Sequence, residues 1–281
     1  MEREIILAEN SGYCFGVKRA VDETIKIKSE NSENIYTLGP LIHNNNVVND
    51  LRKQGVIAIN NENFSDLNKG DVVVIRSHGV KESTINYLND NGFIVKDNTC
   101  PYVSNIHEKV KKYYSLGYKI LIIGNKEHPE VIGINGWCND EAIVINLDNL
   151  DIELPKKVCV VSQTTEKKST WNKVLAKVAD ECKEFIAFNT ICLATDTRQK
   201  SARDIAKKAD MVLVIGGKSS SNTTKLYEIC KEECNNVYHI ENKDDLTEDI
   251  INFNCKTIGI TAGASTPDYI IKEVISILEG K

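Results

Sequence analysis

Three cysteines occur at the same point of a repeated pattern, where they could hold a metal centre. Cys14, Cys100 and Cys192 each follow a short apolar run and polar turn residues, and each directly precedes a helical pattern. A helix N-terminus stabilises the thiolate, the form of cysteine that binds metals. Three thiolates with no histidine at the equivalent position suit an iron–sulfur cubane better than zinc, and they leave one iron open to a substrate oxygen. The alternative is that all three are small buried side chains.

The other six cysteines lack this shared position. The whole chain has nine cysteines, an odd number, so they cannot all pair in disulfides. Disulfides are also uncommon in reducing compartments. Cys230 and Cys234 lie four residues apart on one helix face, but no third ligand is evident. We therefore expect core or surface thiols at the following positions: Cys138, Cys159, Cys182, Cys230, Cys234 and Cys255.

Polar residues at the ends of predicted strands indicate an anion pocket. Three of the five histidines, His43, His78 and His128, follow apolar strands. The third repeat has hydroxyl and amide side chains at the equivalent places, namely Ser220, Ser221, Asn222 and Ser265. Together with backbone N–H groups at helix N-termini, these groups favour a phosphate or diphosphate ligand. A zinc site of three histidines is the rival interpretation, and the absence of an Arg/Lys clamp or a Walker loop argues against nucleotides.

A proton donor is expected on the same loops. Glu130 lies two residues after His128, where a buried carboxyl near an open iron could give a proton to a leaving hydroxide. The alternative is an exposed loop glutamate. Gln163, Thr164 and Thr165 follow another predicted strand and could orient that proton or a substrate hydroxyl.

The elements that must position these residues repeat three times along the 281 residues. Each repeat alternates short apolar strands with amphipathic helices, which indicates α/β units with largely parallel sheets. The third repeat lacks its last strand, and residues 1–13 supply the missing piece. We expect three α/β domains in a trefoil around the metal cluster, with boundaries at 14–98, 99–189, and 1–13 plus 190–281. Ligands then bind beyond the carboxyl ends of the strands.

Composition restricts the partners and the compartment. The formal charge is −5 and the basic residues are scattered, so nucleic acid is not an expected partner. No apolar run approaches the roughly 20 residues that span a bilayer. The chain starts directly with a strand-like segment and lacks the anatomy of a signal peptide, so we expect a cytoplasmic protein without membrane association.

Ten ordered motifs across the whole chain resemble those of the 4-hydroxy-3-methylbut-2-enyl diphosphate reductase family. They are Ser11–Ala20, Gly39–Asn44, Arg76–Val80, Asp97–Pro101, Gly124–Glu130, Gln163–Thr165, Asn189–Cys192, Ala194–Thr195 with Arg198–Gln199, Ser220–Asn222 and Thr261–Ser265. One departure is a run of three serines before Asn222 where two are expected; aligning on Asn222 makes Ser219 the spacer.

The resemblance implies specific roles for the residues above. One [4Fe–4S] cluster per chain would lie on Cys14, Cys100 and Cys192, with Glu130 as the proton relay and Thr164 beside the substrate hydroxyl. The diphosphate would lie among His43, His78, His128, Ser220, Ser221, Asn222 and Ser265. The implied reaction is the reductive dehydroxylation of the allylic diphosphate to isopentenyl and dimethylallyl diphosphates. Ferredoxin or flavodoxin is the family's usual electron donor.

Two other functions are compatible with parts of the pattern. A non-redox [4Fe–4S] dehydratase similar to quinolinate synthase also has three repeated domains and three cysteines, but it would bind carboxylates and need arginine near the open iron. A redox-sensing or diphosphate-binding module without catalysis is the second alternative. Electron-dependent turnover of the allylic diphosphate separates the reductase from both.

Overall fold

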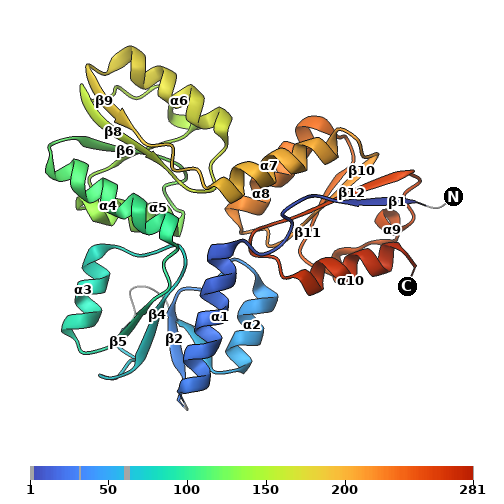
Figure 1. The fold of residues 1–281 in the computed structure, drawn as a ribbon, viewed down its shortest axis with the longest axis horizontal. Helices are drawn as coiled ribbons and strands as arrows, with labels where there is room; N and C mark the ends of the chain where they lie inside the picture. Colours follow the sequence, from blue (N-terminus) through green and yellow to red (C-terminus); the bar gives the residue numbers. More distant parts are fainter. Residues whose placement is uncertain (1–2, 32, 60–63, 281) are drawn as a thin grey trace. The chain divides into compact units, whose positions relative to one another are not determined.

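The computed structural model describes residues 3–31, 33–59 and 64–280, and its strands form three parallel sheets of four strands each (Figure 1). Helices alternate with strands along the chain. Strands buried on both faces read as continuous apolar runs in parallel sheets, and Met211–Ile215, for example, is fully buried along its length. The predicted α/β fold class with three repeated units is confirmed.

The first sheet belongs to the repeat that begins after Cys14. Its strand order is β3 (Val56–Ile59), β2 (Ile35–Leu38), β4 (Val72–Ile75) and β5 (Ile94–Asp97). The helices of this repeat are α1 (Phe15–Glu30), α2 (Asn45–Lys53) and α3 (Glu82–Asp90). Leu38, Ile75 and Leu88 form part of the core between the sheet and α3.

The second sheet has the same order of elements. Its strands are β7 (Ile143–Ile145), β6 (Lys119–Ile123), β8 (Lys157–Ser162) and β9 (Glu184–Ala187). Its helices are α4 (Pro101–Ser115), α5 (Pro129–Asn135) and α6 (Lys168–Glu181), with short 3₁₀ turns at Gly136–Cys138 (η1) and Leu147–Asn149 (η2). The apolar face of α4 packs through Ile106 and Val110 against this sheet.

The third sheet combines both ends of the sequence. Its order is β1 (Glu4–Leu7), β12 (Thr257–Ala262), β10 (Met211–Ile215) and β11 (Val237–Ile240). The accompanying elements are α7 (Leu193–Ala206), α8 (Ser221–Glu233), η3 (Lys243–Asp245), α9 (Glu248–Ile251) and α10 (Asp268–Leu278). Strand β1 pairs in parallel with β12, where the repeat placed the missing strand.

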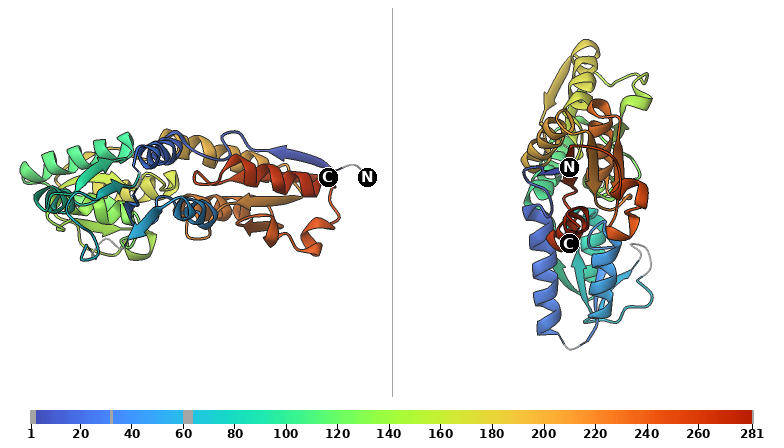
Figure 2. Two further views of the ribbon diagram at one scale, coloured as in Figure 1. Left: turned by 90° about the horizontal axis from the view of Figure 1, so that it is seen from below. Right: turned by 90° about the vertical axis from the view of Figure 1, so that its right-hand side faces the viewer.

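Helices cover both faces of this third sheet (Figure 1). Ile270 and Val274 of α10 pack with Leu213 on one face, whereas Leu226 of α8 packs with Val212 and Ala202 on the other. The view from below in Figure 2 has α10 in front of the sheet. Each fully buried aliphatic side chain contributes about 1.5–3 kcal/mol of transfer free energy, so this packing fixes the strand ends that carry the polar loops.

All three sheets share one topology with a single switch point. The first strand of each repeat lies in the sheet interior, its second strand lies at one edge, and its third and fourth strands continue on the other side. The strands that flank the switch points are β2 and β4, β6 and β8, and β10 and β12. Ligands of open parallel sheets bind outside the carboxyl ends of such strand pairs.

The chain divides into two compact units by its internal contacts. One comprises Met1–Lys18, Ile42–Asn49 and Leu193–Lys281, and the other comprises Arg19–Leu41 and Asp50–Cys192. The threefold axis and the domain boundaries expected from the repeat stay predictions. Among the helices of the described residues, none combines the length and the apolar character needed to cross a membrane.

Candidate active site

The polar residues singled out in the sequence lie on the loops that follow the switch-point strands. In order along the chain, these strands are followed by loops with His43 (after β2), His78 (β4), His128 (β6), Thr164 (β8), Ser220 (β10) and Ser265 (β12). Every repeat therefore supplies two polar loops at the edge of its sheet where ligands bind.

The three predicted cluster cysteines follow the fourth strand of each sheet and precede a helix. Each cysteine comes directly before its helix: Cys14 before α1, Cys100 before α4 and Cys192 before α7. In each repeat the cysteine backbone N–H donates to a carbonyl of the loop after the neighbouring strand. The three bonds are Cys14 N to Ala264 O (3.2 Å), Cys100 N to Ser77 O (3.0 Å) and Cys192 N to Thr164 O (3.0 Å).

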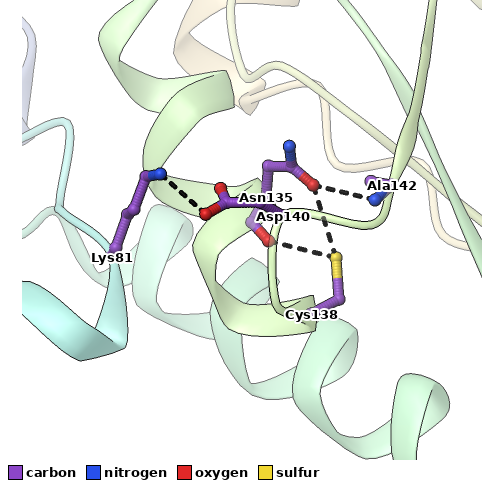
Figure 3. Close-up of polar contacts among 5 residues, drawn as sticks. All are labelled: Lys81, Asn135, Cys138, Asp140 and Ala142. Atoms are coloured by element: carbon purple, nitrogen blue, oxygen red, sulfur yellow. Dashed lines mark hydrogen bonds and ion pairs between the residues drawn. The ribbon is translucent and has the colours of Figure 1, made fainter.

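These cysteines differ in exposure from four of the other six, namely Cys138, Cys159, Cys230 and Cys234, which are buried. Cys14, Cys100 and Cys192 are partly exposed, and Val17 N donates to Cys14 Sγ at 3.4 Å. In contrast, burial raises the pKa of the Cys138 thiol to about 11 and that of Cys159 to about 12. Figure 3 shows Cys138 turned toward Asn135, whose carbonyl oxygen accepts from Sγ at 3.2 Å. The repeated thiols are therefore the ones suited to holding a metal cluster.

The remaining cysteines have the surroundings expected of ordinary thiols. Cys230 and Cys234 are buried, and burial raises the pKa of Cys230 to about 12. Cys182 and Cys255 are partly exposed, and burial raises the pKa of both. All nine cysteines lie in the described part of the chain, and no disulfide joins any of them.

Two arginines, one buried and one partly exposed, hold two of the cysteine loops in place. Arg198 of α7 donates from Nη2 to Gly12 O at 2.8 Å, two residues before Cys14. Arg19 of α1 donates from Nη2 to Thr99 O at 2.6 Å, directly before Cys100. Charge-assisted hydrogen bonds of this kind are shorter and stronger than neutral ones, so both arginines fix the backbone that presents a thiol.

Glu130 is a buried carboxylate paired with Thr164. Its side chain is only 2% exposed, although its sequence position also allowed an exposed loop residue. Oε1 accepts from Thr164 N at 2.5 Å, and Oε2 accepts from the Thr164 hydroxyl at 2.6 Å. Both carboxylate oxygens therefore have a donor, and the hydroxyl oxygen of Thr164 retains lone pairs that can accept a further proton.

His128 is fixed in one tautomer beside His78. It caps the N-terminus of α5, where Nδ1 accepts from Glu130 N at 3.2 Å. Because Nδ1 accepts, the proton of the neutral ring is on Nε2. The ring lies edge-on to that of His78, with 5.5 Å between the centroids. The two imidazoles can therefore present N–H donors to an anion from adjacent loops.

The other compact unit brings together the remaining predicted residues. The hydroxyl of Ser265 donates to His43 O at 3.2 Å, and Ser220 caps α8 by accepting from Thr223 N at 3.4 Å. Asn222 is 4% exposed, and neither of its amide atoms has a hydrogen-bond partner among the described residues. A buried amide of this kind requires a ligand or water. Ser221 begins α8, whereas Ser219 is exposed outside the helix.

The sequence analysis missed a turn that organises the His78 loop. Gly79 N donates to Arg76 O at 3.0 Å, which closes a four-residue turn, and Gly79 has a φ of 70°. His107 of α4 packs against this glycine so closely that a Cβ atom there would lie 2.5 Å from its Cε1.

Trp137 completes this support for the turn. Its ring stacks on that of His107 with 4.9 Å between centroids, and its indole N–H donates to Val80 O at 3.0 Å. The sequence signal for Arg76 was its place directly after an apolar strand and before Ser77-His78. His107 and Trp137 gave no signal beyond a helical apolar pattern.

The fold and these residues define a class of triplicated α/β proteins with one cysteine and two polar loops at the carboxyl edge of each sheet. The profile described as LytB protein matches residues 5–279. This chain belongs to the LytB family.

Similar proteins carry one consistent name. A 4-hydroxy-3-methylbut-2-enyl diphosphate reductase of Clostridium perfringens (strain SM101 / Type A) is 65% identical over 98% of this chain and 98% of its own length. The protein of the same name from Caldanaerobacter subterraneus subsp. tengcongensis is 46% identical over 97% of this chain and 95% of its own.

Solved structures agree with the sequence relatives. The structure of an (E)-4-hydroxy-3-methyl-but-2-enyl diphosphate reductase, described as the terminal enzyme of the non-mevalonate pathway, is 40% identical with a TM-score of 0.72, covering 99% of this chain and 100% of the other. That of an E-1-hydroxy-2-methyl-but-2-enyl-4-diphosphate reductase from Plasmodium falciparum is 27% identical with a TM-score of 0.91, covering 99% and 88%.

Proposed function

We propose that this chain is an oxidoreductase that removes the hydroxyl group of (E)-4-hydroxy-3-methylbut-2-enyl diphosphate. The alcohol takes up two electrons and two protons and gives isopentenyl or dimethylallyl diphosphate plus water, as the last step of the methylerythritol phosphate route. The observation that carries the proposal is near-full-length identity of 65% to a reductase of that name. Family membership favours this reaction over the dehydratase and the non-catalytic alternatives.

One [4Fe–4S] cluster on Cys14, Cys100 and Cys192 is part of the proposal. The partial exposure of the three thiols, their places before helices and their equivalent amide hydrogen bonds fit such a group. When bound, the cluster supplies the electrons and an open iron site for the substrate hydroxyl. The burial of Cys138, Cys159 and Cys230 argues against those thiols as ligands.

Glu130 and Thr164 form the proposed proton route to the leaving hydroxyl. Once protonated, the Glu130 carboxyl gives its proton to the Thr164 hydroxyl oxygen, and the Thr164 hydroxyl passes its own proton to the departing oxygen, which leaves as water. The 2.6 Å separation between Glu130 Oε2 and Thr164 Oγ1 permits this transfer without side-chain movement. Proton transfer by a positioned group typically accelerates a reaction by about 10²–10⁴-fold.

The diphosphate is proposed to bind the remaining motif residues through hydrogen bonds. His78 and His128 would donate N–H groups. His43, Ser220, Ser221, Asn222 and Ser265 are the further proposed ligands, with the N-terminus of α8 as an additional donor. The unpartnered amide of Asn222 supports this assignment. Holding the diphosphate orients the far end of the substrate.

The proposed partner is a ferredoxin or flavodoxin, and the proposed compartment is the cytoplasm. We also retain three α/β domains, at residues 14–98, 99–189, and 1–13 plus 190–281, arranged around the cluster. The reaction requires an external reductant because the substrate gains two electrons. A small electron-transfer protein is the chemical class that delivers them one at a time.

The reaction is tested with anaerobically purified protein, a chemical or protein reductant and the allylic diphosphate. We expect formation of both isomeric diphosphates only when the reductant is present. Turnover without a reductant, or none with a full complement of iron and sulfide, would contradict the proposal.

Glu130→Gln tests the proton route. Glutamine keeps the size of the side chain and can still accept from Thr164 N, but it has no proton to release, so turnover should fall by about 10²–10⁴-fold. Iron and sulfide content should stay at the wild-type level. Glu127→Gln is the matched control, because Glu127 is exposed on the same loop. Equal turnover of the two variants would remove Glu130 from the route.

A further inference from the structure

Arg76 places a guanidinium at the switch point of the first sheet. It follows β4 directly, and β4 pairs with β2 in the register Tyr36 with Val73 and Thr37 with Val74. Two residues beyond the second of these pairs, Gly39 lies opposite Arg76. A Cβ atom on Gly39 would lie 2.7 Å from Arg76 Nη1, so only glycine leaves room for the guanidinium. The charge therefore lies at the carboxyl ends of β2 and β4.

This guanidinium has no counter-charge in the described part of the chain. Arg76 is 4% exposed, and its Nε is fully enclosed without a hydrogen-bond partner. No acidic side chain of the described residues forms an ion pair with it. Burial lowers the pKa of Arg76 to about 10, with no opposing contribution from a carboxylate. A buried, uncompensated charge is strongly unfavourable unless a ligand supplies the partner.

The second repeat has a neutral, satisfied residue at the equivalent place. There Gln163 lies one residue beyond the pair of Ile123 with Ser162, next to Gly124. Its Oε1 accepts from Asn125 N at 3.2 Å, and its Nε2 donates to the Thr165 hydroxyl at 2.9 Å. The fold therefore does not need a cation at this position, because the same architecture is completed by an amide.

The surroundings of Arg76 identify the class of its missing partner. The turn that Arg76 begins also carries His78, so the guanidinium and a proposed phosphate-binding imidazole share one loop. Arg76 leans toward Gly39 and β2, whereas Cys100 follows β5 on the other side of β4. A guanidinium binds phosphate oxygens in a planar, often bidentate geometry. This placement favours the diphosphate over the thiolates of the cluster.

We propose that Arg76 pairs with the diphosphate of the substrate and supplies the fixed positive charge of that site. The proposal rests on the function proposed above and adds a cation to a pocket otherwise built from neutral donors.

Inorganic pyrophosphate tests the proposal by calorimetric titration of the anaerobic cluster-loaded protein. Arg76→Gln installs the residue type of the second repeat and should weaken pyrophosphate binding about tenfold or more, the scale of a lost charge-assisted hydrogen bond. Arg76→Lys keeps the charge without the planar fork and should bind between the wild type and Arg76→Gln. Equal affinity of all three proteins would overturn the proposal.

Lys81→Gln is the matched control for loss of one positive charge. Lys81 follows the same turn, and its ammonium pairs with Asp140 at 2.8 Å on the partly exposed surface (Figure 3). A screened surface charge contributes little, so pyrophosphate affinity should change less than about twofold. A loss of pyrophosphate affinity equal to that of Arg76→Gln would show that any nearby positive charge has the same effect. That result would overturn a specific contact between Arg76 and the diphosphate.

Thermal unfolding provides a second readout. If only a bound anion compensates the charge of Arg76, Arg76→Gln without pyrophosphate should melt at or above the wild-type temperature. Pyrophosphate should then raise the melting temperature of the variant by less than that of the wild type. An Arg76→Gln protein that fails to fold, or is destabilised with full pyrophosphate response, would overturn the proposal. If the wild-type protein binds pyrophosphate through Arg76 but shows no reductant-dependent turnover, the proposed reaction is refuted. The assignment of Arg76 as a diphosphate ligand then still holds.

Discussion

At the scale of single residues, the surroundings of a cysteine decide whether its thiol is suited to bind a metal or to pack in the core. Cys100 is partly exposed, begins a helix and donates its amide to the His78 loop. Cys138 is 1% exposed, and burial raises the pKa of its thiol. Only a thiolate is a good metal ligand, so the same residue type is expected to bind iron at one place and to pack at the other.

Cys100→Ser and Cys138→Ser compare these two cysteines directly. The first variant should lose most of its iron and acid-labile sulfide, together with the visible absorption and the activity. The second should retain all of them, because a serine hydroxyl can still donate to Asn135 O. Metal analysis and absorption spectra of anaerobically purified proteins check this pair. Equal cluster content in both would contradict the choice of ligands.

Candidate site residues that recur in the repeats could be predicted from sequence, whereas the hydrogen-bond and charge partners of each side chain could not. The cysteines were recognisable because they recur at equivalent points of three repeats, and the histidines because they follow apolar strands. Arg76 was not, because a charged residue after a strand normally lies in solvent. That it is buried without a partner follows only from the positions of Gly39 and the loops around it. The burial of Glu130 was likewise open until its bonds to Thr164 were visible.

At the scale of elements, one tight turn joins a strand to two helical segments. The turn from Arg76 to Gly79 follows β4. Within this turn, Ser77 O accepts a hydrogen bond from the backbone N–H of Cys100, directly before α4. His107 from the middle of α4 packs on Gly79, and Trp137 of η1 packs on His107. The position of His78 is therefore set by packing between elements rather than by its own loop alone.

Gly79→Ala should disturb this turn more than a simple change of backbone preference. Gly79 and Gly117 have similar positive φ values, 70° and 79°, but a Cβ on Gly117 would meet nothing within 4 Å. Gly117→Ala should cost about 1 kcal/mol from strain. Gly79→Ala should cost about 1–3 kcal/mol more because it overpacks His107. Urea unfolding measures both, and equal losses would show that the contact does not matter.

His107 makes stability depend on pH. Burial lowers its pKa to about 4 from 6.5, with Asp97 acting in the opposite direction. Between these values the unfolded chain binds a proton that the folded chain does not, so stability is full above about pH 6.5 and falls as the pH falls toward 4. His107→Phe keeps an aromatic ring on Trp137 without titrating.

The difference between the two proteins isolates this group. From pH 7 to pH 5 the unfolding free energy of the wild type should decline more steeply than that of His107→Phe, by at most about 1.4 kcal/mol per pH unit. His239, whose pKa is also lowered by burial, is present in both proteins and cancels from the comparison. Identical pH dependence would show that His107 is charged when folded or is not buried.

The interior strands and the edge strands that precede the three repeated cysteines were predictable from sequence, whereas the strands at the opposite edges were not. Residues of β4 and β10 are buried on both faces and form continuous apolar runs. The edge strand β7 has three residues, and β11 is half-buried with a tyrosine and a histidine, so neither differs clearly from a loop in sequence. Helices that start after the polar loops, such as α5, were also missed because their first residues were read as loop.

At the scale of the whole molecule, the sequence is a repeat whose starting point has been shifted. Helix α3 connects β4 to β5 and α6 connects β8 to β9, but the strand that should follow α10 is β1 at the other end of the chain. Ile5 of β1 packs against the same core as Ile271 and Val274 of α10. The third repeat therefore differs from the other two in taking its last strand from the opposite end of the chain.

A circular permutant tests this relationship. Moving residues 1–10 to follow Lys281 through a flexible Gly/Ser linker would restore the order of the other two repeats. Because β1 would keep its pairing with β12, the permutant should fold, load iron and retain turnover within about tenfold of the wild type, with the linker entropy as the main cost. Deleting residues 1–10 outright is the control and should destabilise the third sheet. Equal behaviour of both would show that β1 is dispensable.

The amide bonds from Cys14, Cys100 and Cys192 to the loops of Ser265, His78 and Thr164 have a consequence for durability in air. Through each of these bonds the proposed cluster and the proposed substrate would share one piece of backbone. Free-energy coupling between two such ligands is reciprocal. A compound that occupies only the proposed substrate loops should therefore also slow the loss of iron from the proposed cluster in air.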